Sequence, residues 1–216
     1  IVRNGPPRSW MELPMRANND RLGVVHLAYV GAVAEQDGVE GLAAVLASLR
    51  EHAPHLDVRL TVIGDGNARP ALEAESLRYG VSERVRITGW VAPEAVPELL
   101  SEADVCVDPA PATPLNHRST MMKVAEYLAL GKPVVAYDLA ETRATVGDAA
   151  LLVPAGDVHQ FARQIQRLAE DPQLRAGLAL QGRERAAELT WDISAARLLS
   201  AYAGFGAGNG THGESA

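Results

Sequence analysis

The sequence contains a single cysteine, no long apolar run and fewer basic than acidic residues. Cys106 has no partner for an intrachain disulfide and lies in the apolar segment Val105–Val107, so nothing indicates an oxidising compartment. No segment approaches the ~18 consecutive apolar residues of a membrane helix. The net charge of −7 is opposite in sign to that of a nucleic-acid-binding surface. These absences predict a cytoplasmic globular protein that binds no nucleic acid and has no transmembrane segment.

Several catalytic patterns are also missing. The sequence shows no Cys and His spacing typical of a metal site, no Ser, His and Asp set, and no isolated carboxylate pair with distinct acid and base environments. A dinucleotide fingerprint would place G-x-G-x-x-G at the start of the first helix, whereas Gly31–Gly38 is acidic and has different spacing. We therefore assign no metal ligand and no catalytic residue, and the polar groups favour binding over covalent chemistry.

The chain has 216 residues, 47% of them hydrophobic, and alternates short apolar runs with helical patterns. Nearly continuous apolar strands, each followed by a helix, are typical of a parallel sheet covered on both faces. The predicted strands are Val24–Val30, Arg59–Ile63, Arg84–Thr88, Asp104–Asp108, Val134–Tyr137 and Ala150–Val153. The predicted helices are Val39–Arg50, Ala68–Tyr79, Pro93–Glu102, Ser119–Leu130, Glu141–Thr145, Val158–Ala169, Pro172–Leu189 and Asp192–Ala203. The expected fold class is α/β, with a Rossmann-like doubly wound parallel sheet of about six strands.

The pattern divides the chain into three parts. Residues 1–21 mix Pro, Asn and Asp without a period and are interpreted as a hinge or linker. Residues 22–203 form the folded domain, and the Gly-rich residues 204–216 are expected to be a disordered tail. Ile1–Gly5 resembles the end of a strand entering a turn, which favours a chain that starts within a longer protein.

In an open parallel sheet, ligands bind at the loops after the strands. Gly64 and Gly66 follow the second strand and either form a simple turn or let a ligand approach the backbone closely. After the third strand come Gly89, Trp90 and Val91. The Trp90 ring would stack on a nucleobase or pack against the protein.

The start of the helix after the fourth strand is the strongest candidate site. Ser119 or Thr120 is expected to be its N-cap, and a helix start exposes unpaired N–H groups and a positive dipole end. The side chains of His117, Arg118 and Lys123 would add donors, so a phosphate or diphosphate is the expected ligand.

On a helical wheel, Ser119, Lys123 and Glu126 share a polar face. Glu126 would then form an ion pair with Lys123 or accept hydrogen bonds from ribose hydroxyls. Other polar side chains have simpler expected roles. Asp138, Glu141 and Arg143 would contact a ligand or pair with one another, Asp157 would cap the next helix, and His26 and Cys106 would lie in the core.

The segment from Asn116 to Glu126, followed by Tyr127–Ala136, resembles the donor-binding C-terminal domain of the family-four retaining glycosyltransferases, the glycosyl transferases group 1 with the GT-B fold. Further matching segments follow in the family's order: Val62–Gly66, Val85–Val91, Ala103–Val105 and Gly147–Asp157. The resemblance covers most of residues 22–203.

The resemblance implies half of a GT-B fold and a hexosyltransferase-type enzyme that uses a nucleotide sugar as substrate, with no metal or other cofactor. It places the diphosphate and sugar at Asn116, His117, Arg118, Ser119, Thr120, Met121 and Lys123. It places the ribose at Glu126 and the base near Gly64, Gly66, Gly89, Trp90 and Val91. The acceptor would bind an N-terminal domain missing from this chain, so this part alone is expected to be inactive. A role in polysaccharide or glycoconjugate biosynthesis follows, in the cytoplasm or, through the missing domain, at the periphery of a membrane.

Two positions depart from the family's pattern. The first of its two signature glutamates, which are separated by seven residues, is Arg118 here. The Arg and Lys that many members carry after the first strand are absent from Ala32–Asp37, so Arg118, Lys123 and the helix start would replace them. The alternatives are a non-catalytic nucleotide-binding or regulatory module, and a GT-B relative such as an NDP-sugar epimerase or a phosphorylase. The sequence does not identify the base, sugar or acceptor.

Overall fold

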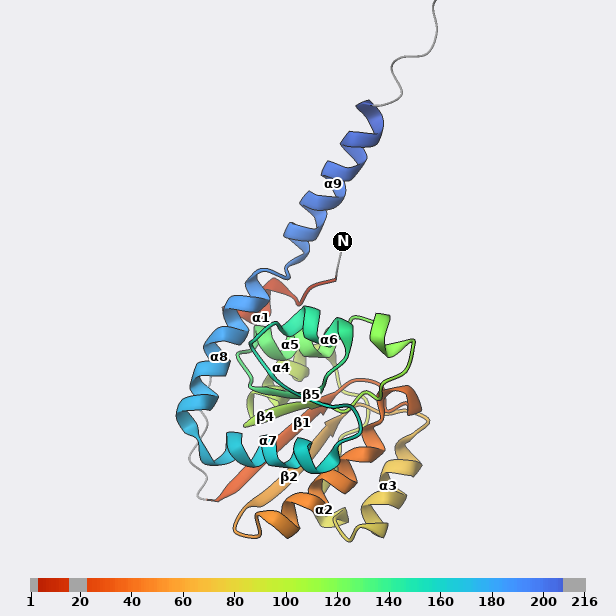
Figure 1. Ribbon diagram of the computed structural model, residues 1–216, viewed down its shortest axis with the longest axis vertical. Helices are drawn as coiled ribbons and strands as arrows, with labels where there is room; N and C mark the ends of the chain where they lie inside the picture. Colours follow the sequence, from red (N-terminus) through yellow and green to blue (C-terminus); the bar gives the residue numbers. More distant parts are fainter. Residues whose placement is uncertain (1–3, 16–22, 208–216) are drawn as a thin grey trace, which may run out of the picture.

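The computed structural model describes residues 4–15 and 23–207, and the side chains as far as residue 203. Its centre is a six-stranded sheet with the strand order β3-β2-β1-β4-β5-β6 (Figure 1). The strands are β1 (Val24–Val30), β2 (Asp57–Ile63), β3 (Val85–Ile87), β4 (Val105–Asp108), β5 (Val134–Tyr137) and β6 (Leu151–Val153). Every neighbouring pair in the sheet is parallel. The predicted α/β fold is confirmed.

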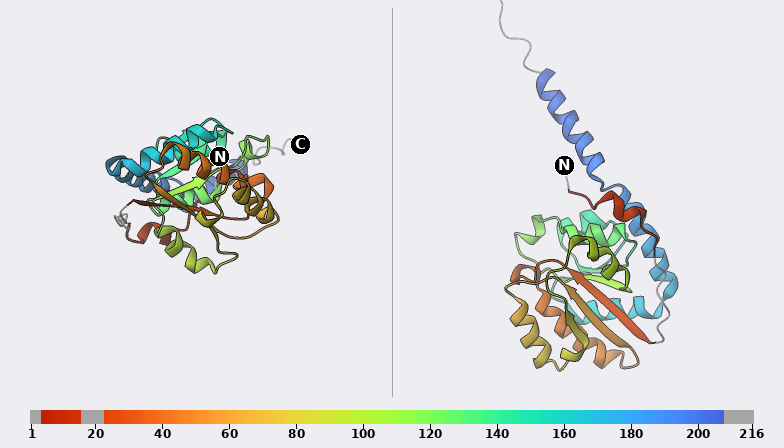
Figure 2. Two further views of the ribbon diagram at one scale, coloured as in Figure 1. Left: turned by 90° about the horizontal axis from the view of Figure 1, so that it is seen from below. Right: turned by 180° about the vertical axis from the view of Figure 1, so that it is seen from behind.

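Helices cover both faces of the sheet (Figure 2). They are α1 (Arg8–Glu12), α2 (Leu42–His52), α3 (Arg69–Arg78), α4 (Val96–Ser101), α5 (Met122–Ala129), α6 (Ala140–Val146), α7 (Val158–Glu170), α8 (Pro172–Ala187) and α9 (Trp191–Ala207). Within the described ranges, no helix is long and apolar enough to cross a membrane.

The structure differs from the expected linker at the start of the chain and from the expected tail at its end. The expected linker contains helix α1, which packs against α5 and α8. Helix α9 continues through residues 204–207, which were expected to belong to the tail, and it projects from the body of the molecule (Figure 1). Residues 1–3 and 16–21 of the expected hinge and residues 208–216, the rest of the expected tail, lie outside the described residues.

The core consists of two clusters, one on each face of the sheet. Leu27 and Tyr29 of β1 pack with helices α2 and α7, whereas Ala28 packs on the opposite face with α5. This division follows from the alternation of side chains along a strand. All residues of β4 and β5 are buried, which explains why both strands are apolar apart from Asp108 at the end of β4. The Cys106 thiol is fully buried, as predicted, and burial raises its pKa to about 12. His26 is only half-buried, so its expected core position was only partly correct.

The strand order places the topological switch point between β1 and β4. Strand β1 leads towards α2 on one face of the sheet, and β4 leads towards α5 on the other. The loops after these neighbouring strands therefore diverge, and such a divergence is where open α/β sheets bind ligands. Residues 31–41 and 109–121 thus form the two walls of the candidate site.

The loops after the first three strands pack closely at the same edge. Gly64 forms a bridge with Gly89, and a Cβ atom on Gly64 would lie 2.0 Å from the carbonyl oxygen of Gly31. A Cβ on Gly66 would lie 2.3 Å from the Val33 carbonyl oxygen. Both glycines are therefore required for contact between loops, so neither of the two expected roles, a simple turn or close ligand approach, describes them fully.

Replacing Gly64 with alanine should destabilise the fold by at least about 2 kcal/mol, because the new Cβ clashes with backbone and the φ of +140° disfavours a side chain. The matched control is Gly177→Ala in α8, where a Cβ meets no atom within 4 Å. The control should stabilise the helix by about 0.5–1 kcal/mol. Urea unfolding of both variants measures the effects, and equal midpoints would contradict the close approach.

Candidate functional site

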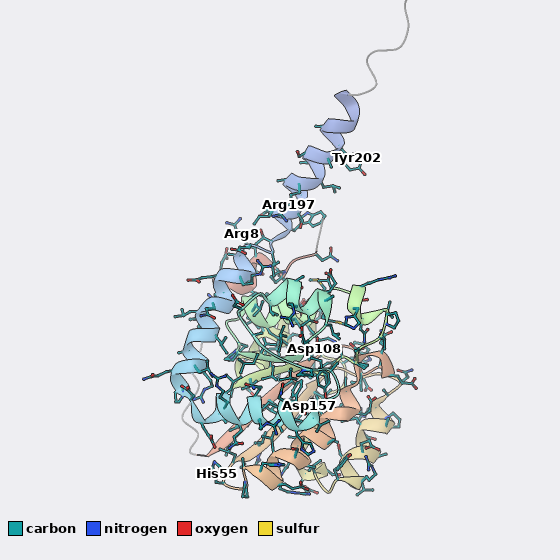
Figure 3. The ribbon with its side chains drawn as sticks, viewed as in Figure 1. Arg8, His55, Asp108, Asp157, Arg197 and Tyr202 are labelled. Atoms are coloured by element: carbon teal, nitrogen blue, oxygen red, sulfur yellow. The ribbon has the colours of Figure 1, made fainter. Side chains whose placement is uncertain are left out.

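Four polar side chains converge at the switch point. They are Tyr29 on β1, Asp37 in the loop after β1, Asp108 at the end of β4 and Lys123 in the first turn of α5. The Lys123 Nζ donates to Asp37 Oδ1 at 2.5 Å and to the Tyr29 hydroxyl at 3.1 Å. It lies 3.8 Å from Asp108 Oδ1, an ion pair without hydrogen-bond geometry. Asp108 lies in the interior of the molecule (Figure 3).

Burial and charge compete within this cluster. Burial alone would lower the pKa of Lys123, but Asp108, Tyr29 and Asp37 together raise it above its ordinary value, so the ammonium stays charged. Burial raises the pKa of Asp108, and Lys123 offsets part of this effect. Burial likewise raises the pKa of Tyr29, so its hydroxyl stays neutral and donates to the Ala32 carbonyl.

Further contacts join the walls of the site beside this cluster. Asn116, which is buried, donates from its amide nitrogen to the Gln36 carbonyl at 2.8 Å and to the Pro111 carbonyl at 2.9 Å. Gly38 has a φ of +63°, and a Cβ there would lie 2.8 Å from the Pro109 carbonyl oxygen. The Asn116 amide group is thus committed to the loops, so it serves the protein's own structure first.

The helix start differs from the prediction. Helix α5 begins at Met122 with Met121 as its N-cap, so the expected cap at Ser119 or Thr120 was wrong. Residues 116–118 form a short 3-10 turn, after which the backbone is extended at Ser119. The Ser119 hydroxyl donates to the Leu115 carbonyl, and the Thr120 hydroxyl donates to Glu141 Oε2. This local turn delays the helix by about one turn.

The helix start nevertheless carries the features of an anion site. The first N–H groups of a helix have no intrahelical acceptor, and the dipole makes this end positive. Arg118 lies exposed just before α5, and within the described part of the chain its guanidinium has no ion-pair partner. His117 is exposed as well, and its Nδ1 accepts the Ala140 N–H at 3.3 Å. Lys123 differs from the expectation, because its ammonium is already paired inside the protein.

Glu126 lies one turn further along α5 and is half-buried. Burial raises the pKa of its carboxyl group, an effect that Lys123 partly offsets. Among the described side chains, the Lys123 ammonium pairs with Asp37 and Asp108 and not with Glu126. The expected alternative of a Lys123–Glu126 ion pair is therefore wrong, and the Glu126 carboxylate is left with acceptor capacity.

At the loop after β3, the Trp90 ring is 74% exposed. Packing against the protein, one of its two expected roles, is thus excluded, and the ring offers a flat apolar surface. Val91 packs instead against the core cluster on the α5 face. Gly89, which precedes both residues, has a φ of +72°, a backbone conformation that glycine adopts without strain.

The remaining polar side chains have structural partners. Arg143 pairs with Asp138, which confirms the expected pairing for these two residues, whereas Glu141 accepts a hydrogen bond from Thr120, a partner outside the expected set. Asp157 caps α7 by accepting the Gln160 N–H at 2.8 Å, as predicted. The residues that the structure describes include no group of three or more His, Cys, Asp or Glu placed to hold a metal ion.

Sequence reasoning missed three members of the central cluster: Tyr29, Asp37 and Asp108. The sequence does contain an indication for Asp108 and for Asp37. Asp108 ends an otherwise apolar strand, and Asp37 lies in the loop where basic residues were expected but absent. Their connection to Lys123 depends on the strand order, which brings positions 86 and 15 residues away from Lys123 together.

Comparisons with known proteins place this fold and site in a family. The family model described as glycosyl transferases group 1 matches residues 25–171. The chain belongs to this glycosyltransferase family, and its parallel sheet matches the Rossmann-like domains of GT-B structures.

Curated relatives of this chain are glycosyltransferases as well. An alpha-D-kanosaminyltransferase from Streptomyces kanamyceticus is 30% identical over 153 residues, which are 70% of this chain and 38% of the relative. A D-inositol 3-phosphate glycosyltransferase from Salinispora arenicola is 31% identical over 185 residues, which are 82% of this chain and 40% of the relative. The chain thus spans less than half the length of these curated relatives.

Among solved structures, sucrose-phosphate synthase from Thermosynechococcus elongatus superposes with a TM-score of 0.68 and 26% identity over 96% of this chain and 52% of that one. Anabaena Alr3699/HepE in complex with UDP superposes with a TM-score of 0.73 over 94% of this chain and 57% of that one. Its identity is 18%, so it supports the fold alone.

Replacing Lys123 with methionine should destabilise the protein by about 3–5 kcal/mol, because Asp37 and Asp108 would be left as buried carboxylates without a cation. Arg163→Met in α7 is the matched control, since this side chain is exposed. Urea unfolding at pH 7 measures both changes. A loss no larger than that of the control would show that the buried cluster adds no stability.

Proposed function

We propose that this chain is the donor-binding domain of a retaining glycosyltransferase and binds a nucleotide-diphosphate sugar at the switch point. The observation that carries this proposal is the start of α5: a positive helix end beside the exposed Arg118, one turn before the Glu126 carboxylate. Membership of the glycosyl transferases group 1 family supports it.

The proposed donor lies along the carboxyl edge of the sheet. Its diphosphate contacts the first N–H groups of α5 and Arg118, with His117, Ser119, Thr120 and Met121 around it. Glu126, on the next turn of α5, accepts hydrogen bonds from the ribose hydroxyls. The base lies towards Gly89 and the exposed Trp90 ring, on which it stacks.

In the proposed reaction, the bond between the sugar C1 and the diphosphate oxygen breaks and a bond from C1 to the acceptor oxygen forms, while the proton of the acceptor hydroxyl passes to the departing diphosphate. Negative charge develops on the departing diphosphate, where the helix dipole and Arg118 stabilise it. The acceptor is held by a further domain of a longer protein, so this chain supplies the leaving-group half of the site and binds the donor without transferring it. Binding both substrates in one crevice supplies the orientation that the transfer requires.

Isothermal titration calorimetry with UDP, GDP and ADP tests donor binding directly. We expect one of the three to bind in the micromolar to millimolar range, because the charge-assisted contacts are few. Failure of all three at millimolar concentration would refute the proposal.

Glu126→Ala should weaken binding of the preferred nucleotide about tenfold or more, since hydrogen bonds to a charged carboxylate are lost. The same nucleotide lacking both ribose hydroxyls gives the matched comparison. It should bind the parent protein more weakly and should bind the parent and the variant equally. Glu184→Gln on α8, an exposed position, serves as the remote control. A Glu126→Ala loss that persists with the dideoxy nucleotide would place the ribose elsewhere.

A further inference from the structure

Lys123 and Asp37 join the two walls of the switch-point crevice. We propose that they form a positioning clasp, which holds the loop after β1 against α5, and that Lys123 supports nucleotide binding through this loop without contacting the phosphates. The ligand part of this inference rests on the proposed function. We define the clasp as Asp37, Lys123 and Asn116 with the loop residues 36–38 that they hold.

The first step is that partners within the protein surround the Lys123 ammonium. An ammonium has three N–H donors. Two are used in hydrogen bonds to Asp37 and Tyr29, and the ammonium also faces Asp108 at 3.8 Å and the Tyr29 ring at 4.7 Å. At most one N–H is therefore left for a phosphate oxygen, on an ammonium that Asp37, Tyr29 and Asp108 already surround.

The second step is burial. The side chains of Lys123 and Asp37 are only 11% and 12% exposed. A buried pair is poorly screened by water and salt, so it holds its two segments together more firmly than a surface pair does. Breaking it to admit a ligand would leave one charge buried without compensation.

The third step is that the clasp acts on consecutive loop residues. Gln36 is held through its carbonyl by the Asn116 amide, Asp37 through its carboxylate by Lys123, and Gly38 packs against the Pro109 carbonyl. All three holding residues come from the segment after β4. The loop also supplies Gly31, whose absent Cβ would lie 3.2 Å from Lys123 Cε. The loop is thus held by the segment after β4 at Gly31 and again at residues 36–38.

The fourth step is that the two possible roles of Lys123 predict opposite changes in diphosphate affinity when Asp37 is removed. Asp37 adds negative charge beside an anion site, so if Lys123 were a phosphate ligand, removing Asp37 would free its ammonium and strengthen diphosphate binding. If the pair is a clasp, removing Asp37 loosens the loop, and binding weakens because the loop must be ordered again. The two roles predict opposite changes for one substitution.

The first experiment needs no nucleotide. Amide hydrogen exchange at Gly38 and Gly41, whose N–H groups donate to Glu35 and Gly38, reports the stability of the loop. Asp37→Asn and Lys123→Gln should each speed exchange about tenfold, and the double variant should be no faster than the faster single variant. Glu35→Gln removes a negative charge from the same loop at an exposed position and should leave exchange unchanged. Unchanged exchange in Asp37→Asn would overturn the clasp.

The second experiment is calorimetry with whichever of UDP, GDP and ADP binds the parent protein most tightly. Asp37→Asn should raise its Kd about tenfold, and Glu35→Gln should not raise it. An unchanged or lower Kd in Asp37→Asn would overturn the positioning role. If no nucleotide binds the parent protein, the proposed function and the positioning role that rests on it both fail, and exchange still decides whether the loop is held.

A further pair of variants covers the case in which Lys123→Gln does not fold. Asn116→Ala removes the amide that holds Gln36 and keeps all charges in place. Combined with Asp37→Asn, it should speed exchange at Gly38 by less than the product of the two single effects, because both contacts hold the same turn. Independent, multiplying effects would show that the loop is held at unrelated points.

Discussion

The buried ammonium of Lys123 is the interaction on which the candidate site depends. Strands β1 and β4 are neighbours in the sheet, yet the segments that follow them turn to opposite faces. Nothing in a parallel sheet itself holds two diverging loops together, because backbone pairing ends with the strands. The Lys123 ammonium lies between Asp37 and Asp108 and supplies one such connection where water is largely excluded, beside the contact of the Asn116 amide with Gln36.

In this arrangement, holding the two loops together and binding an anion fall to different groups, although one basic residue could do both. The Lys123 ammonium inside the crevice pairs with the protein's own side chains, and the proposed anion site lies outside it, at the helix start and at Arg118. The helix start contributes fixed N–H groups that need no reorganisation when a ligand arrives. An acidic protein can therefore offer a local anion site without a basic surface.

The fold class could be predicted from the sequence because the patterns that indicate strands and helices are local. Continuous apolar runs such as Val134–Tyr137, each bounded by a glycine or a loop, indicate buried parallel strands wherever they are placed. The start of α5 was misplaced, since Ser119 and Thr120 are good caps in isolation but the turn formed by residues 116–118 directs their hydroxyls to other acceptors. The partners of Lys123 were not predictable, because they depend on strand order, which no local pattern encodes.

The close packing of glycines at the carboxyl edge limits how such a site can diverge. Gly64 and Gly66 touch the backbone of the loop after β1, so those positions admit no side chain and the edge keeps one shape. Variation in what the crevice recognises must then arise at positions that face outward, of which the exposed Trp90 and Arg118 are the nearest examples. At Gly64 and Gly66 the fold thus leaves no room for a side chain that could alter recognition, and exposed side chains elsewhere on the edge are the positions where a substitution can change it.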